Sequence, residues 1–256
     1  RLGRILLNIG KVDEAEPAAR RAVELADKLG PYQQVNPCFI MAEFAALRGD
    51  AKLTQIAGQR GMQLMAKVFA PDTARFQKAK IRFGRALLDI GKIDEADALF
   101  GEVMQADAQR AAVYDSPWTS ASILHARAQI ARGQPSAAVP ALDAALSKYL
   151  AQPANIRDLN EELDLRLSLG RALSMTDHAK EALPHLERAL ALRQPQFASS
   201  PLLAEAQLAL ADCKLRLGDA AAARTLLTRA KTIHAANRQL AERFRQPLRD
   251  LEQRLR

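Results

Sequence analysis

The chain has few of the residue types that build redox, metal or cofactor sites. Its two cysteines, Cys38 and Cys213, are too few for a disulfide framework and lack the paired spacing of a zinc site, so we expect two buried, apolar thiols. The four histidines accompany no HExxH pattern, and neither a GxxxxGK[ST] phosphate loop nor a GxSxG nucleophile elbow is present. The sequence therefore predicts a non-enzymatic protein with no catalytic residues, no metal and no cofactor.

Long hydrophobic runs are also missing. No stretch approaches the roughly 20 uncharged apolar residues of a membrane span, and no signal peptide is visible, so we expect no membrane insertion within these residues. The first residue is Arg1, and it opens directly into an apolar helical pattern. We therefore expect a fragment of a longer protein. Its compartment stays open: cytoplasmic, or periplasmic if the parent has a transmembrane span upstream.

Aromatic residues make up only 5% of the 256 residues, whereas 48% are hydrophobic, with Ala and Leu dominant. This composition favours helix over sheet. The formal net charge of +8 favours acidic partners. Because the charges are interleaved along the chain and few aromatics could stack on bases, nucleic acid is disfavoured as the partner.

A phrase repeats along the chain: "LGRILLNIGKVDEAE" near the start returns as "FGRALLDIGKIDEAD". A small or acidic residue that ends a first helix recurs every 39 to 44 residues: Gly10, Gly49, Gly91, Gly133, Asp177 and Gly218. Glycine there suits a left-handed helix C-cap. A large residue followed by a small one, as in Phe83-Gly84 and Leu169-Gly170, precedes each turn and predicts close helix packing.

Prolines support the same register. Three prolines each lie seven residues after the turn residue of their repeat: Pro17, Pro140 and Pro184. Proline destabilises a helix little only in the first turn, where the backbone N–H has no helical partner. We therefore expect the second helices to begin near residues 12–13, 136–137 and 179–180. Thr54, Gly58 and Gly61 replace the expected core residues of the second repeat, which predicts that this repeat is the most loosely packed.

The tail from residue 237 has apolar residues at helical spacing and many arginines. This spacing predicts a capping element with a solvent-exposed arginine face, broken into two pieces at Pro247. The apolar residues are Leu240, Phe244, Leu248, Leu251 and Leu255. The arginines are interpreted as a solvated helix face; a docking patch for an acidic protein and a nucleic-acid or membrane surface are the alternatives.

These offsets of small, large and turn residues resemble the tetratricopeptide repeat, in a variant of about 42 residues in place of the usual 34. The resemblance implies an all-α, right-handed α-α superhelix of about six helix pairs plus a C-terminal capping helix. We expect one domain over residues 1–256, with repeats at 1–30, 36–69, 76–113, 119–150, 160–193 and 202–235 and a cap at 237–256.

In this family the first helices line a concave groove, and the residue after the small one faces it. Here those positions are Arg4, Glu43, Arg85, Arg127, Arg171 and Asp212. Apolar residues about one turn away would flank the arginines: Ile81, Leu88, Ile123, Ile130 and Leu167. Guanidinium groups bind carboxylates in a bidentate way. The alternative is structural: the arginines pair with neighbouring carboxylates such as Asp89 or Asp164.

The resemblance thus implies a protein- or peptide-interaction module that binds an acidic or C-terminal peptide in an arginine-lined groove. A weaker resemblance, carried by the tail and the Ala/Arg-rich repeats, is to the C-terminal repeat regions of bacterial signalling proteins such as serine/threonine kinases and transcription regulators. A self-association scaffold, with a homodimer, and a small-ligand-sensing domain are the alternatives.

Overall fold

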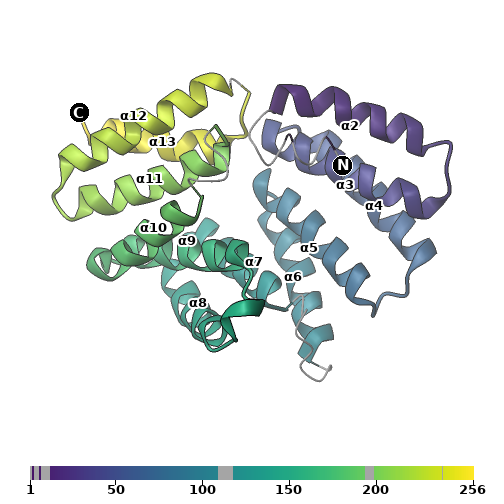
Figure 1. Cartoon of the computed structure of the whole chain (residues 1–256), viewed down its shortest axis with the longest axis horizontal. Helices are drawn as coiled ribbons and strands as arrows, with labels where there is room; N and C mark the ends of the chain where they lie inside the picture. Colours follow the sequence, from purple (N-terminus) through teal and green to yellow (C-terminus); the bar gives the residue numbers. More distant parts are fainter. Residues whose placement is uncertain (1, 3–5, 7–11, 109–117, 194–198, 238) are drawn as a thin grey trace. The chain divides into compact units, whose positions relative to one another are not determined.

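The computed structural model describes residues 2, 6, 12–108, 118–193, 199–237 and 239–256. Over these residues the ordered elements are twelve α-helices and one short 3-10 helix, with no strand. The helices are α2 (Val12–Ala26), α3 (Pro31–Arg48), α4 (Ala51–Val68), α5 (Ala74–Asp89), α6 (Ile93–Ala108), α7 (Trp118–Ala131), α8 (Pro135–Leu150), α9 (Leu159–Met175), α10 (Ala179–Arg193), α11 (Pro201–Arg216), α12 (Ala220–Ala236) and α13 (Glu242–Arg254), with the 3-10 helix at Ala154–Ile156 (Figure 1).

The chain forms two compact units. Unit 1 contains residues 1–128 and 239–243, and unit 2 contains residues 129–238 and 244–256. Within unit 1, α3 lies along α4 and α5 along α6; within unit 2, α9 lies along α10 and α11 along α12 (Figure 1). The all-α prediction is confirmed, and each unit has the sequential helix pairs of a tetratricopeptide-like α-α solenoid. None of the described helices is long and apolar enough to cross a bilayer.

The turns between paired helices have the predicted left-handed backbone. Gly49, Gly91, Gly133 and Gly218 have φ values from 76° to 86°. Asp177, at the equivalent place in the fifth repeat, is the one described residue other than glycine with positive φ, at 63°. Short polar side chains tolerate this region better than most. Gly10, the first of the predicted turn residues, lies outside the described residues.

Small residues in the first helices allow the close approach that the sequence predicts. A Cβ at Gly84 of α5 would lie 2.5 Å from the ring of Phe100 on α6. A Cβ at Gly170 of α9 would lie 2.6 Å from Cγ of Leu186 on α10. Real Cβ atoms do not come this close to other heavy atoms, so each glycine makes room for a large side chain of its partner helix.

The expectation of a loose second repeat is wrong. A Cβ at Gly58 of α4 would lie 2.2 Å from the Phe83 ring, and one at Gly61 would lie 3.0 Å from the Phe39 ring. Thr54 is fully buried, and its hydroxyl donates a 2.6 Å hydrogen bond to the backbone oxygen of Asp50. The small residues are therefore not gaps: phenylalanine rings from α3 and α5 fill the space that they leave.

The second helices begin where predicted, at Val12, Pro135 and Ala179. The inference that their prolines lie in the first turn is wrong. Pro17, Pro140 and Pro184 are each the sixth residue of their helix, where the missing N–H removes a helical hydrogen bond. All three are exposed, so water can hydrate the carbonyl that loses its donor.

The predicted break of the tail at Pro247 is also wrong, because α13 is one helix from Glu242 to Arg254 with Pro247 inside it. Phe244 and Leu251 of this helix are each 2% exposed, so its apolar face is covered as expected for a cap. On its polar side, Glu252 accepts an ion pair from Lys231 at 2.5 Å. Side-chain packing and ion pairs thus hold the helix despite the proline.

Candidate functional site

The predicted arginine positions lie on successive first helices. Arg85 of α5 is exposed, whereas Arg127 of α7 and Arg171 of α9 are half-buried. Arg4 lies outside the described residues. Arg85 and Arg127 belong to unit 1 and Arg171 to unit 2. Unit 1 therefore presents two of these arginines at equivalent places of neighbouring repeats.

The apolar residues predicted to flank the arginines are buried. Each is at most 8% exposed: Ile81, Leu88, Ile123, Ile130 and Leu167. Ile81 and Leu88 belong to the main core of unit 1, together with Phe39 and Phe100. These side chains pack between helices and do not form the surface flanking the arginines that the sequence predicts. These five residues are therefore not available to flank a bound peptide.

In unit 1 the equivalent position of the second repeat, Glu43, holds an ion pair. Its Oε1 accepts from Nε of Arg82 on α5 at 2.7 Å, and Nη1 of Arg82 donates to Oδ1 of Asn36 at 2.9 Å. The Arg82 guanidinium also lies 5.1 Å from the ring centre of Phe39, a cation–π distance. Sequence reasoning missed Arg82, although it lies three residues before Arg85 and so on the same side of α5.

In unit 2 the equivalent positions are paired with charged side chains of the same or neighbouring helices. Nη1 of Arg171 donates to Oε1 of Glu205 on α11 at 2.9 Å. Asp212 of α11 accepts from Arg216 at 2.8 Å and also from Arg254 of α13. This arrangement resembles the structural alternative. Of the carboxylates named for it, Asp164 lies 3.8 Å from Arg193 in unit 2, and Asp89 lies 2.7 Å from Arg243 in unit 1.

Near the start of α9, a buried carboxylate joins two helices. Glu162 is 6% exposed and accepts from Arg166 at 2.8 Å and from Arg188 of α10 at 3.0 Å. Burial alone would raise the pKa of Glu162, but the hydrogen bonds from Arg188 and Arg166 outweigh it and lower the pKa below its usual value. The helix α9 begins at Leu159 with Asp158 as its N-cap, and Glu161 and Glu162 lie in its first turn. These charges fasten α10 to α9.

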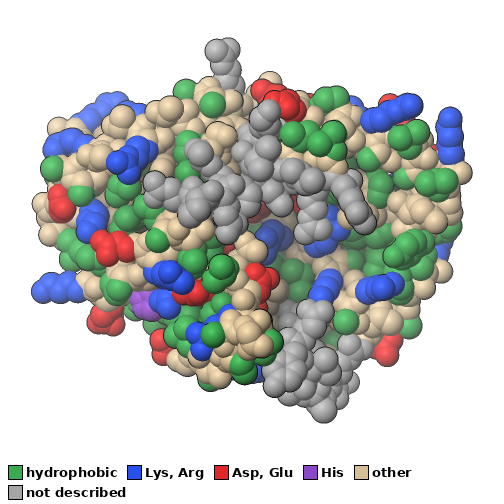
Figure 2. Space-filling model, in the orientation of Figure 1, with side chains coloured by type: hydrophobic (Ala, Val, Ile, Leu, Met, Phe, Trp, Pro, Cys, Tyr) green, Lys and Arg blue, Asp and Glu red, His purple; other side chains and the backbone are tan. Residues whose placement is uncertain are grey.

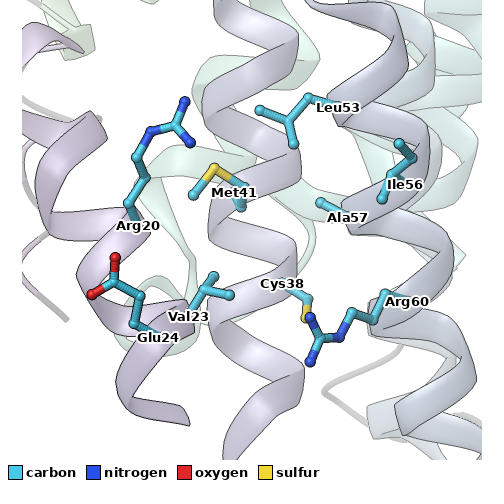
Figure 3. Close-up of a pocket in the computed structure, with 9 residues that line it drawn as sticks. All are labelled: Arg20, Val23, Glu24, Cys38, Met41, Leu53, Ile56, Ala57 and Arg60. Carbon is cyan, nitrogen blue, oxygen red and sulfur yellow. The ribbon is translucent and has the colours of Figure 1, made fainter. Parts of the chain in front are cut away.

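A cavity of about 280 Å³ opens between α2, α3 and α4 of unit 1. Figure 3 shows side chains of all three helices pointing into it. The lining residues are Arg20, Val23, Glu24, Cys38, Met41, Leu53, Ile56, Ala57 and Arg60. Both cysteines are free and buried, as the sequence predicts, but only a tertiary structure could show that Cys38 lines a cavity.

Charged side chains do not gather into one patch on the face seen in Figure 2, where basic and acidic groups are interspersed. No group of His, Cys, Asp and Glu within the described part of the chain is arranged to hold a metal ion.

Comparison with known structures shows the same architecture. A Rap protein complexed with competence and sporulation factor is 13% identical over 99% of this chain and 73% of its own, with a TM-score of 0.65. BtubC from P. vanneervenii is 18% identical over 89% of this chain and 92% of its own, with a TM-score of 0.59. The tetratricopeptide-like repeats of a putative kinesin light chain from Podosopora anserina are 20% identical over 80% and 96%, with a TM-score of 0.54.

Among curated proteins, no sequence matches this chain. Two models of the tetratricopeptide repeat family do match it, one over residues 161–236 and one over residues 1–29. The first match spans the helix pairs α9–α10 and α11–α12. The left-handed turns, the small residues in the first helices and these two matches agree: the chain is a tetratricopeptide repeat protein.

Proposed function

We propose that this protein is a non-catalytic interaction module of a larger bacterial signalling protein, and that it binds an acidic peptide or a free peptide C-terminus along its first helices. Arg85 and Arg127 make the contact in unit 1. The observation that carries the proposal is the recurrence of arginine at equivalent places of α5 and α7, with Arg85 exposed. Guanidinium groups at regular steps suit carboxylates spaced along a peptide.

Two further observations support this function. Tetratricopeptide repeats generally serve as protein- or peptide-binding scaffolds, and the Rap protein with the same fold was solved with a bound factor. Arg171 lies at the equivalent place of the fifth repeat and is paired with Glu205 at 2.9 Å, so a ligand carboxylate there would have to compete with Glu205.

The test is a fluorescence-polarisation titration with a labelled acidic peptide that ends in a free carboxylate, repeated with the C-terminal amide. Replacing Arg85 and Arg127 together by Ala should weaken binding about tenfold or more, since hydrogen bonds to charged groups contribute roughly 1.5–3 kcal/mol each. The control is the double variant Lys52→Ala, Lys67→Ala, which removes the same charge from exposed positions of α4. Equal loss in both variants would show a general charge effect and overturn the arginine site.

Light scattering on the purified protein separates this function from a self-association scaffold. A monomer that binds the peptide supports the proposal. A stable dimer that the Arg85 and Arg127 substitutions leave intact, together with no peptide binding, would favour the scaffold.

A further inference from the structure

The cavity of unit 1 has an apolar floor that the packing of the repeats does not fill. Cys38, Met41 and Ala57 form this floor and are 3%, 6% and 7% exposed. Val23 of α2 and Ile56 of α4 stand on opposite walls, and Ile56 is 54% exposed. A large aliphatic side chain left half in water beside an open cavity is a surface that a ligand could cover.

The size of the cavity suits a small apolar group. An engineered apolar cavity of about 150 Å³ binds benzene, and this cavity holds about 280 Å³. Small-molecule sites are concave and mostly apolar, with a few placed polar groups. The wall and floor residues here fit that description, and the polar groups are two arginines and one glutamate.

The arginines give the cavity its chemical preference. Arg20 of α2 and Arg60 of α4 lie on opposite walls, and the guanidinium of Arg60 reaches across to the thiol of Cys38 (Figure 3). Nη2 of Arg60 bonds to Oδ1 of Asp27 at 2.6 Å, with the two side chains 44% and 47% exposed. An exposed ion pair contributes only about 0–1 kcal/mol, so an entering carboxylate can share this guanidinium at little cost.

We infer that this cavity binds a small amphipathic carboxylic acid. The apolar tail lies on Met41 and Ala57 between Val23 and Ile56, and the carboxylate faces Arg60. This site is separate from the proposed peptide contact on Arg85 and Arg127, so either can fail without the other.

Cys38 supplies a reporter for occupancy, because its thiol lies on the cavity floor. The probe is octanoate, and octanol is its uncharged counterpart. Alkylation of Cys38 by iodoacetamide in the whole chain is followed by mass spectrometry. Because burial raises the pKa of Cys38, the reaction is run at about pH 8.5, near the ordinary thiol pKa. Octanoate should slow this reaction at least fivefold in a saturable way, with a weaker effect of octanol. Cys213, which is fully buried in unit 2, is the internal control.

Cavity variants test the same site by calorimetric titration of octanoate. Ala57→Leu fills the floor and should abolish binding, whereas Ala66→Leu, at an exposed position of the same helix, should not. Arg60→Gln should weaken octanoate at least fivefold and leave octanol unchanged, with Lys67→Gln as the charge control.

The outcomes are distinct. Equal binding of octanoate and octanol overturns the carboxylate preference. Octanoate binding that survives Ala57→Leu, or no binding of octanoate to the wild-type chain by calorimetry, overturns the site. Loss of both ligands in Arg60→Gln would mean that Arg60 shapes the cavity and does not select the headgroup.

Discussion

At the scale of single residues, the spacing between packed helices depends on glycines, which have no side chain to hold the helices apart. Gly58, Gly84 and Gly170 each leave room for a large side chain of a neighbouring helix. Thr54, one turn before Gly58 in α4, is buried, and its hydroxyl donates a hydrogen bond to the backbone oxygen of Asp50. Glycine in a helix costs roughly 0.5–1 kcal/mol relative to alanine, and the large side chains packed at these positions offset that cost.

A glycine substitution tests this packing. Gly58→Ala should lower the free energy of unfolding by about 1–3 kcal/mol, the usual cost of overpacking a core, because its Cβ would lie 2.2 Å from the Phe83 ring. Gly101→Ala is the matched control: nothing lies within 4 Å of a Cβ there, so helix propensity should make it stabilising by about 0.5–1 kcal/mol. Urea unfolding measures both. Equal effects would mean that ring packing at Gly58 is unimportant.

At the scale of the element, the second helices tolerate prolines because those prolines face water. Pro140 is exposed and is the sixth residue of α8, whereas Pro135 is the first residue of the same helix. The first residue of a helix has no intrahelical acceptor for its N–H, but the sixth residue does. The helix α8 thus carries two prolines: Pro135, which suits its position, and Pro140, which removes a hydrogen bond.

This contrast gives a prediction within one helix. Pro140→Ala should raise the free energy of unfolding by about 1–3 kcal/mol, because an N–H at residue 140 can donate to the carbonyl of Ser136 and proline disfavours helix interiors. Pro135→Ala should be neutral or slightly destabilising, because proline is well placed at the first position. Thermal unfolding followed by circular dichroism compares the two, and a destabilised Pro140→Ala would contradict this account.

At the scale of the whole molecule, acid sensitivity is expected to come from unit 2, where burial lowers the pKa of two histidines, His185 and His234. Burial lowers the pKa of His185, helped by Arg166 and opposed by Asp143. Burial also lowers the pKa of His234. Both are therefore harder to protonate in the folded protein than in the unfolded chain. Their contribution to stability is present above the ordinary histidine pKa of about 6.5 and is lost as the pH falls toward the folded values.

The measurement is the urea midpoint as a function of pH. As the pH falls from about 7 to about 5, the urea midpoint of the wild type should decrease. The midpoint of the double variant His185→Gln, His234→Gln should decrease less. His178→Gln, an exposed histidine on the turn before α10, controls for the substitution itself. A double variant with the same pH slope as wild type would show that these histidines do not carry the effect.

The sequence by itself determined the repeat register, because turn geometry and helix periodicity are local properties. Spacing and residue type predict left-handed turns at Gly49 and Gly91 and place Asp177 at the equivalent turn, and the starts of α2 and α10 follow from the same register. The sequence could not show that Phe39 and Phe83 fill the space beside Gly61 and Gly58, because those rings come from other helices.

Only the tertiary structure decided how side chains from different repeats are used. It placed Ile81 and Leu88 in the core, gave Arg171 the partner Glu205, and brought Cys38 and Arg60 together at one cavity. A repeat pattern specifies the face on which a residue lies, since that depends on neighbours three and four positions away. Burial, ion pairing and cavities depend on residues dozens of positions away, and no local pattern encodes those distances.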